Sequence, residues 1–333
     1  MRKKAVSLLS GGLDSTLATK LIIEQGVEVV GLHFTSPFCT CNKGGKDNGS
    51  CGLQAARTAQ ELGVKVVVRP KGLEYMDIVR SPRHGYGRNM NPCIDCRIFI
   101  LRKASEVMVA EDAGFVITGE VLGQRPMSQT KQALKLIDKE SGLEDLILRP
   151  LSARHFPATR PEREGIVNRE RLLDITGRSR KSQLVLANTF NLKEFGCPGG
   201  GCLLTDPLFV PRVKDLLAHD ENPTMRDVSL LRIGRHFRLG PETKLIIGRN
   251  KEENERLAVF ASPPCVRLSP VGFQGPEVLL EGAIDDHVLE IAANIVAYYA
   301  KLPALPVTVE VRNANPTKQM FPYIALDPNT FKL

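Results

Sequence analysis

Residues 10–15 read Ser10-Gly11-Gly12-Leu13-Asp14-Ser15, and this stretch decides how the first half of the chain folds. The apolar run 5–9 precedes it, and residues 16–23 follow with the composition of a helix. A strand, a glycine turn and a helix N-terminus in this order form an anion site, because glycine lets a phosphate approach the backbone and the helix dipole adds positive potential. A Walker A loop and a dinucleotide fingerprint both need other spacings. The stretch predicts a pyrophosphate cradle; the alternative is a tight turn capped by Asp14.

Length and composition indicate a globular, enzyme-sized protein. The chain has 333 residues, 42% of them hydrophobic and 25% charged, and no apolar run approaches a membrane span of roughly 18 residues. Because the N-terminus leads straight into a strand, we expect a cytoplasmic protein without membrane contact. The net charge of +8 attracts polyanions, and residues 149–181 hold nine basic against four acidic side chains. A solvated charged face is the alternative interpretation.

Apolar runs at 27–34, 64–68 and 115–119 alternate with helical patterns at 51–62 and 91–112. This alternation predicts the α/β class, with a doubly wound parallel sheet whose ligands bind beyond the carboxyl ends of the strands. We expect three parts: a nucleotide domain over 1–150, a basic connecting segment with a cysteine-bearing loop over 151–220, and a small α+β domain over 221–333.

Cys93 and Cys96 form a C-x-x-C pair behind Asn91-Pro92. With Asn91 as N-cap and Pro92 in the first helical position, the two cysteines share the first turn of a helix. A helix N-terminus favours a thiolate, so a reactive pair is expected, with a buried structural pair as the alternative.

Residues 10–15 resemble the loop of the N-type ATP pyrophosphatases, the PP-loop family, which have an adenine nucleotide alpha hydrolase-like fold and cleave ATP between the α and β phosphates. The stretch Thr118-Gly119-Glu120-Val121-Leu122-Gly123-Gln124, followed by Ser128-Gln129-Thr130, resembles the corresponding loop of tRNA 4-thiouridine synthases with one extra residue. Residues 148–217 resemble the connecting segment of those enzymes and of the 2-thiouridylases. PP-loop enzymes that thiolate tRNA are therefore the leading family.

The resemblance implies roles for individual residues. Residues 10–15, namely Ser10, Gly11, Gly12, Leu13, Asp14 and Ser15, would bind ATP, with Asp14 holding Mg²⁺ or orienting the loop. His33, Phe34 and Gly119 would lie on the adenosine side, and Arg97 or Gln129 would contact phosphates. The basic residues 178–183 would form a lip for phosphates.

The eight cysteines predict metal or sulfur chemistry. By resemblance to cluster-dependent thiolases, Cys93, Cys96 and Cys202 would hold a [4Fe-4S] cluster whose fourth iron presents sulfide; a persulfide relay is the alternative, and Cys197 competes with Cys202. Cys39, Cys41 and Cys51, with His33, form either a zinc site or a plain loop. Cys265 is expected to be a buried apolar residue.

Residues 227–312 resemble the RNA-binding NFACT-R domain. They contain a predicted hairpin, then a helix that starts after Gly248-Arg249-Asn250 and includes Asn254. A small packing or dimerisation domain is the alternative.

Together these features predict an ATP-dependent tRNA thiolase, which adenylates a uridine carbonyl oxygen and replaces it with sulfur. The expected cofactors are ATP, Mg²⁺ and the cluster. The expected partners are tRNA and a sulfur donor, either sulfide or a cysteine desulfurase or carrier. A PP-loop ligase acting on another carbonyl and a non-catalytic RNA-binding adaptor are the alternatives. The choice between 2-thiouridine and 4-thiouridine and the oligomeric state, a homodimer included, stay open.

Overall fold

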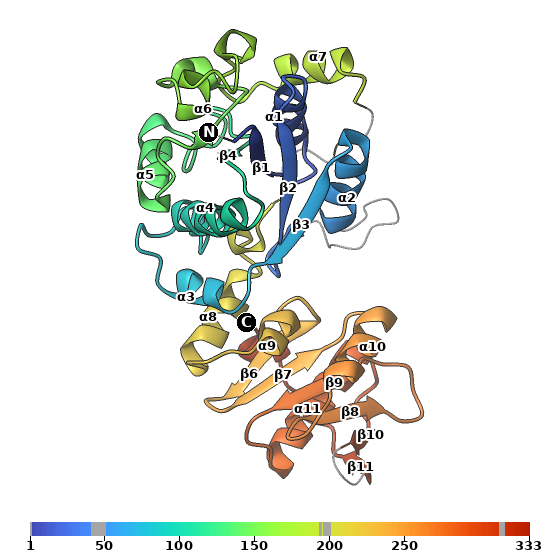
Figure 1. Ribbon diagram of the computed structural model, residues 1–333. Helices are drawn as coiled ribbons and strands as arrows, with labels where there is room; N and C mark the ends of the chain where they lie inside the picture. Colours follow the sequence, from blue (N-terminus) through green and yellow to red (C-terminus); the bar gives the residue numbers. More distant parts are fainter. Residues whose placement is uncertain (1, 41–50, 193–194, 196–200, 313–316) are drawn as a thin grey trace. The chain divides into compact units, whose positions relative to one another are not determined.

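The computed structural model describes residues 2–40, 51–192, 195, 201–312 and 317–333. The chain divides into two compact units, Met1–Asp206 and Pro207–Leu333 (Figure 1). Each unit has its own sheet.

The first unit contains a five-stranded sheet with the order β3-β2-β1-β4-β5, in which every neighbouring pair is parallel. Its strands are β1 (Lys4–Leu8), β2 (Glu28–Thr35), β3 (Lys65–Pro70), β4 (Phe115–Ile117) and β5 (Ile147–Leu148). The middles of the central strands are mostly apolar and buried, because helices cover both faces of the sheet. The predicted doubly wound parallel sheet is confirmed.

Two cores lie on the two faces of this sheet. One contains Leu17 and Ala18 of α1, and the other contains Leu101 and Ala104 of α4. The helices of the layers are α1 (Leu13–Ile23), α2 (Cys51–Leu62), α3 (Glu74–Arg80), α4 (Cys93–Ala110) and α5 (Lys131–Ser141). Because β1 lies in the centre, the turn that joins β1 to α1 opens at the middle of the carboxyl edge, where ligands of such sheets bind.

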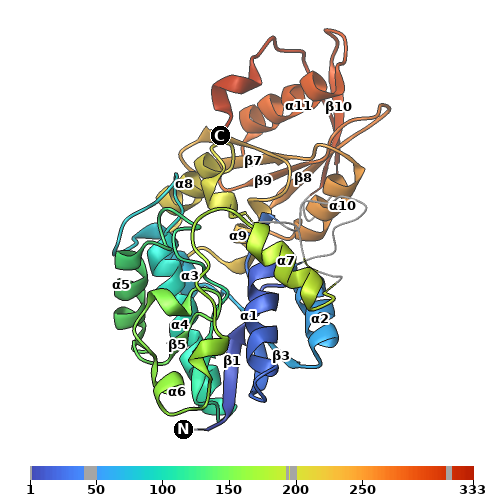
Figure 2. The same ribbon diagram turned by 90° about the horizontal axis from the view of Figure 1, so that it is seen from above.

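The connecting segment folds back onto the first unit. Its helix α7 (Lys181–Thr189) packs against α1, and Leu186 and Ala187 join the apolar cluster that contains Leu17 (Figures 1 and 2). The other short helices of this segment are η2 (Ala153–His155), α6 (Arg160–Arg163), η3 (Arg169–Arg171) and η4 (Leu203–Thr205).

The second unit is built on a six-stranded antiparallel sheet with the order β11-β10-β8-β9-β7-β6. Its strands are β6 (Arg235–Gly240), β7 (Thr243–Ile247), β8 (Val266–Pro270), β9 (Val278–Glu281), β10 (Val307–Arg312) and β11 (Thr317–Phe321). Its helices are α8 (Val210–His219), α9 (Met225–Leu230), α10 (Lys251–Phe260), α11 (Asp286–Ala300) and the short η5 (Pro328–Phe331). The predicted hairpin followed by a helix is confirmed as β6, β7 and α10. No helix in the described ranges has the length and apolar character that a membrane crossing requires.

Candidate active site

The turn after β1 has the geometry of an anion cradle. Gly11 has a φ of +76°, and a Cβ there would lie 2.9 Å from backbone atoms of Gln54 and Ala55 in α2. The Ser10 and Ser15 hydroxyls lie 3.0 Å apart. The N-cap of α1 is Gly12, which has no side chain to accept from the first-turn N–H groups. These N–H groups can therefore serve a bound anion.

Gly119 allows the loop after β4 to touch this cradle. A Cβ on Gly119 would lie 2.5 Å from the Ser15 backbone nitrogen and 2.7 Å from the carbonyl carbon of Asp14. Real Cβ atoms do not approach backbone so closely, and backbone at a helix N-terminus cannot move aside as a flexible side chain can. Only glycine fits here.

Replacing Gly119 by alanine is expected to displace the loop from the cradle. Overpacking of this kind costs about 1–3 kcal/mol of unfolding free energy, and the displaced cradle should bind ATP weakly. Chemical denaturation and ATP titration measure the two effects. Gly72→Ala is the matched control, because a Cβ on Gly72 would meet no heavy atom within 4 Å. Equal ATP affinity of the two variants would contradict the role of Gly119.

Asp14 accepts hydrogen bonds from two residues distant in the chain. Its Oδ2 lies 3.1 Å from Gln124 Nε2 and 3.3 Å from Arg180 Nη2. Its Oδ1 is buried and has no hydrogen-bond partner among the described residues. A buried carboxylate oxygen without a partner is costly, and an oxygen-seeking cation such as Mg²⁺ would satisfy it.

His33 and Phe34 point to opposite faces of β2, as neighbours in a strand do. His33 Nδ1 lies 3.0 Å from the carbonyl oxygen of Leu9, and its Nε2 is buried without a partner in the described part of the chain. Burial holds the pKa of His33 below its ordinary value, so the ring is neutral at pH 7 and Nε2 is an acceptor. Phe34 instead packs in the core beneath α4. The two residues therefore face different surroundings.

Arg97 and Glu120 belong to a network of ion pairs that includes the loop 118–130, to which Glu120 belongs. Arg97 Nε lies 3.6 Å from Glu120 Oε1, and Arg149 donates to Glu120 at 3.0 Å and to both oxygens of Asp138. Burial would raise the pKa of Glu120, but the charges of Arg149 and Arg97 lower it. Gln129 is 2% exposed, and its Oε1 lacks a partner among the residues described.

Helix α4 starts with the C-x-x-C pair, one residue later than predicted. Its N-cap is Pro92 and not Asn91. The Asn91 carbonyl accepts from the backbone N–H groups of Gly87 and Cys93, so Asn91 belongs to the preceding loop. Cys93 and Cys96 share the first turn as expected. The prediction that the helix N-terminus favours both thiolates is wrong for Cys93, since burial raises the pKa of this thiol.

Cys96 is held by two residues that the sequence analysis missed. Lys71 Nζ donates to Cys96 Sγ at 3.0 Å and lies 4.7 Å from the centre of the Tyr75 ring. Burial would raise the pKa of Cys96, but the charge and hydrogen bond of Lys71 and the hydrogen bond of Tyr75 lower it. Of the two cysteines on α4, Cys96 is therefore the one that the protein stabilises as a thiolate.

Cys202 comes to the C-x-x-C pair from 106 residues further along the chain. It pairs with Cys39 in an isolated antiparallel bridge, in which Leu203 N donates to Phe38 O at 2.7 Å. On the other side, Met90 N donates to Leu204 O at 3.1 Å. Burial raises the pKa of Cys202 to about 11.

The three cysteines named as cluster ligands lie within electrostatic range of one tyrosine. Burial raises the pKa of Tyr75, and a negative charge on Cys96, Cys202 or Cys93 would raise it further. Arg125, in the loop that carries the extra residue, interacts electrostatically with both Cys93 and Asp14. One arginine is therefore within electrostatic range of both the cradle and the C-x-x-C pair.

The choice between a zinc site and a plain loop for Cys39, Cys41 and Cys51 stays open, because the side chain of Cys51 lies outside what the structure describes. Across the described ranges, no group of three His, Cys, Asp or Glu side chains lies close enough to hold a single metal ion. Cys41 and Cys197 lie outside the described residues. The prediction that Cys265 is a buried apolar residue is wrong, because the half-buried thiol accepts from Arg226 Nη2 at 3.1 Å and lies 3.7 Å from Glu281 Oε1.

In the second unit, the motif that predicted RNA binding has a structural role. A Cβ on Gly248 would overlap Asn254 Oδ1, which accepts from Glu277 N, and Asn250 caps α10 by accepting from Glu253 N at 3.0 Å. The motif therefore shapes the β7–α10 turn.

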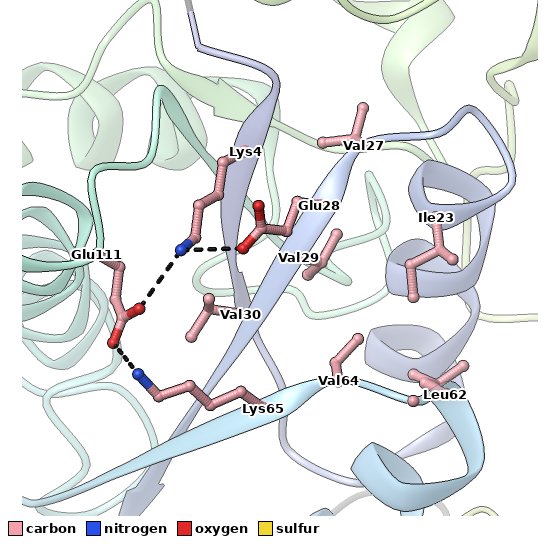
Figure 3. Close-up of a pocket in the computed structure, with 11 residues that line it drawn as sticks. Lys4, Ile23, Val27, Glu28, Val29, Val30, Leu62, Val64, Lys65 and Glu111 are labelled. Atoms are coloured by element: carbon pink, nitrogen blue, oxygen red, sulfur yellow. Dashed lines mark hydrogen bonds and ion pairs between the residues drawn. The ribbon is translucent and has the colours of Figure 1, made fainter.

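A cavity of about 400 Å³ lies at the amino ends of β1, β2 and β3, away from the cradle (Figure 3). Lys4 pairs there with Glu28 at 3.0 Å and with Glu111 at 3.6 Å, and Lys65 also pairs with Glu111. Ligands of parallel sheets bind at the carboxyl edge, and the two lysines already have carboxylate partners. This cavity is therefore not part of the candidate active site.

Comparison with known proteins agrees with this geometry. Residues 1–155 match the family model described as thiamine biosynthesis protein (ThiI), and residues 234–330 match the NFACT protein RNA binding domain. A probable tRNA sulfurtransferase from Moorella thermoacetica is 32% identical over 151 residues, 45% of this chain and 36% of the relative. A tRNA-specific 2-thiouridylase MnmA from Clostridium acetobutylicum is 28% identical over 131 residues, 36% of each protein.

Among solved structures, a predicted subunit of tRNA methyltransferase from Methanocaldococcus jannaschii aligns with a TM-score of 0.31 and 16% identity, over 44% of this chain and 67% of that one. The chain spans about a third of the length of the curated relatives it matches. The resemblances expected from residues 10–15 and 118–130 and from the hairpin after residue 233 are confirmed. Residues 1–155 are thus similar to the ThiI family, and residues 234–330 are similar to the NFACT RNA-binding domain.

Proposed function

We propose that this protein is an ATP-dependent tRNA thiolase that replaces a uridine carbonyl oxygen with sulfur. One observation carries the proposal: a PP-loop cradle and three cysteines from two distant segments meet at the same edge of one sheet. The named relatives act on tRNA, and residues 234–330 are similar to an RNA-binding domain, which supports tRNA as the acceptor.

Two chemical steps need two kinds of group. A carbonyl oxygen is a poor leaving group, so it must first become an adenylate, and the cradle of residues 10–15 would hold the pyrophosphate that leaves. Asp14 Oδ1, buried without a partner among the described residues, suits Mg²⁺, which would neutralise the departing phosphates. His33 Nε2 and Gln129 Oε1 are buried acceptors without partners among the described residues, and they would accept hydrogen bonds from the nucleotide.

The cysteines would hold the group that delivers sulfur in the second step. Cys93, Cys96 and Cys202 are the donor types that iron-sulfur clusters use, and all three lie within electrostatic range of Tyr75. A [4Fe-4S] cluster held by these three thiolates would leave one iron free to bind sulfide. Lys71 and Tyr75 would keep Cys96 ionised until a ligand arrives. A persulfide on one of the same thiols is the alternative route.

Anaerobic reconstitution with iron and sulfide distinguishes the two routes. We expect a brown protein with the broad absorbance of thiolate-to-iron charge transfer, and we expect Cys93→Ser and Cys202→Ser to lose it. Cys265→Ser is the matched control, since Cys265 lies in the second unit. A colourless protein that carries a persulfide on one of the three cysteines would contradict the cluster and favour the relay.

Nucleoside analysis tests the function itself. Mass spectrometry of digested tRNA from a strain without this gene should show the loss of one thiolated uridine, and the lost nucleoside identifies the modified position. The gene should restore it when reintroduced. Unchanged thiolated nucleosides would contradict the proposal.

A further inference from the structure

The cradle contains no positively charged side chain. Residues 10–15 include no lysine or arginine, and Asp14 adds a full negative charge. The N-terminus of α1 contributes a positive potential equivalent to only about half an elementary charge. A polyphosphate bound here therefore requires a protein cation from another part of the chain, in addition to any metal ion.

Arg180 is placed to be that cation. Its Nη2 lies 3.3 Å from Asp14 Oδ2, although the two residues are 166 positions apart. The side chains are 29% and 13% exposed, so the pair lies at the mouth of the cradle and not in the core. Arg178 and Lys181, one on each side, are exposed and add positive charge to the same rim.

The fold holds Arg180 at this position from two directions. Before it, Ile175 N donates to Leu151 O and Gly177 N donates to Leu122 O, both at 2.8 Å, so the segment is bound to the loops that follow β5 and β4. After it, α7 starts at Lys181 and packs on α1 through Leu186 and Ala187 (Figure 2). Neither attachment uses the guanidinium.

A purely structural role explains this arrangement less well. Partly exposed ion pairs contribute little to stability, and α7 already has apolar contacts with α1. Asp14 Oδ2 also has a second donor, Gln124, which would remain if Arg180 moved away. The ion pair between Arg180 and Asp14 can therefore break while the contacts that hold the segment in place remain.

We propose that Arg180 supplies the cation for the β- and γ-phosphates of ATP, leaving Asp14 when the nucleotide enters. A guanidinium donates two parallel hydrogen bonds to phosphate oxygens, which suits a bidentate contact. Its departure would free Asp14 to bind Mg²⁺. The inference rests on the proposed function, because it needs ATP to bind in the cradle of residues 10–15.

Calorimetric titration of the full-length protein with ATP, pyrophosphate and AMP, each with Mg²⁺, tests the inference. Arg180→Gln is expected to raise Kd for ATP and pyrophosphate about 10- to 100-fold, the usual effect of losing a charge-assisted hydrogen bond, and to leave Kd for AMP unchanged. Arg171→Gln is the matched control. Arg171 lies in the same segment and donates to Glu24 O at the opposite end of α1, so its loss should change none of the three constants.

The outcomes separate this inference from the proposed function. If wild type binds ATP and Arg180→Gln binds ATP and pyrophosphate equally well, Arg180 is not the cation, whereas the thiolase proposal stands. If Arg180→Gln weakens the binding of AMP as much as the binding of pyrophosphate, the role of Arg180 is structural and the inference fails. If wild type binds neither ATP nor pyrophosphate, the proposed function itself fails.

Discussion

Asp14→Asn is expected to lower the rate of tRNA-dependent pyrophosphate release by about 100- to 1,000-fold, the usual cost of removing one group that stabilises transition-state charge. The substitution keeps the size of the side chain and removes its charge. It also removes the carboxylate oxygen, buried and without a partner in the described ranges, that is proposed to hold Mg²⁺. A coupled pyrophosphate assay measures the effect.

Binding of tRNA is the internal control for this variant, because a filter-binding Kd should stay unchanged if only the nucleotide site is damaged. Asp77→Asn is the matched carboxylate control, since Asp77 is exposed on α3. Pyrophosphate release by Asp14→Asn at the rate of Asp77→Asn would exclude a catalytic role for Asp14.

Cys96→Ser is expected to reduce thiolation to less than about a thousandth of the wild-type rate, as for removal of a reacting group. A serine hydroxyl is not ionised at pH 7, so it can accept from Lys71 only as a neutral oxygen and offers no thiolate sulfur. Adenylation needs only the cradle, so pyrophosphate release in the presence of tRNA should continue. Thiolated nucleoside and pyrophosphate, measured in one reaction, separate the two steps.

Cys265→Ser should leave both steps unchanged and is the control for a general effect of losing a cysteine. If Cys96→Ser lost pyrophosphate release and thiolation together, the two steps could not be assigned to separate groups of residues. Continued thiolation by Cys96→Ser would remove this cysteine from the reaction.

The parts that could be predicted from the sequence are those encoded in neighbouring residues. The turn at 10–15, the C-x-x-C pair and the strand-helix alternation are local patterns with direct physical meaning, and they led to the sheet, the edge where ligands bind, and the cradle. Gly119 was predicted on the adenosine side from the family pattern of its loop; the structure shows that it packs against Asp14 and Ser15, and its role toward a nucleotide stays a prediction.

The partners of the site residues could not be predicted in this way. Lys71 and Tyr75 lie outside any motif and reach Cys96 only through the folding of α3 against α4. Arg180 was visible as one charge of a basic run, but its contact with Asp14 spans 166 residues. Cys265 was misjudged because its partner, Arg226, lies on a different element. Contacts of this length depend on tertiary packing, on which periodicity and composition carry no information.

The pairing that places Cys202 also sets the order in which the molecule can mature. Thr40 contacts Gly201 across 161 residues, and Asn89 contacts Thr205 across 116. Because contacts so distant in sequence form late, and cannot form before the ribosome has made residue 205, the turn at 10–15 can assemble on a nascent chain that still lacks Cys202. Folding of this turn and of the parallel sheet around it would therefore precede closure of the Cys39–Cys202 backbone bridge.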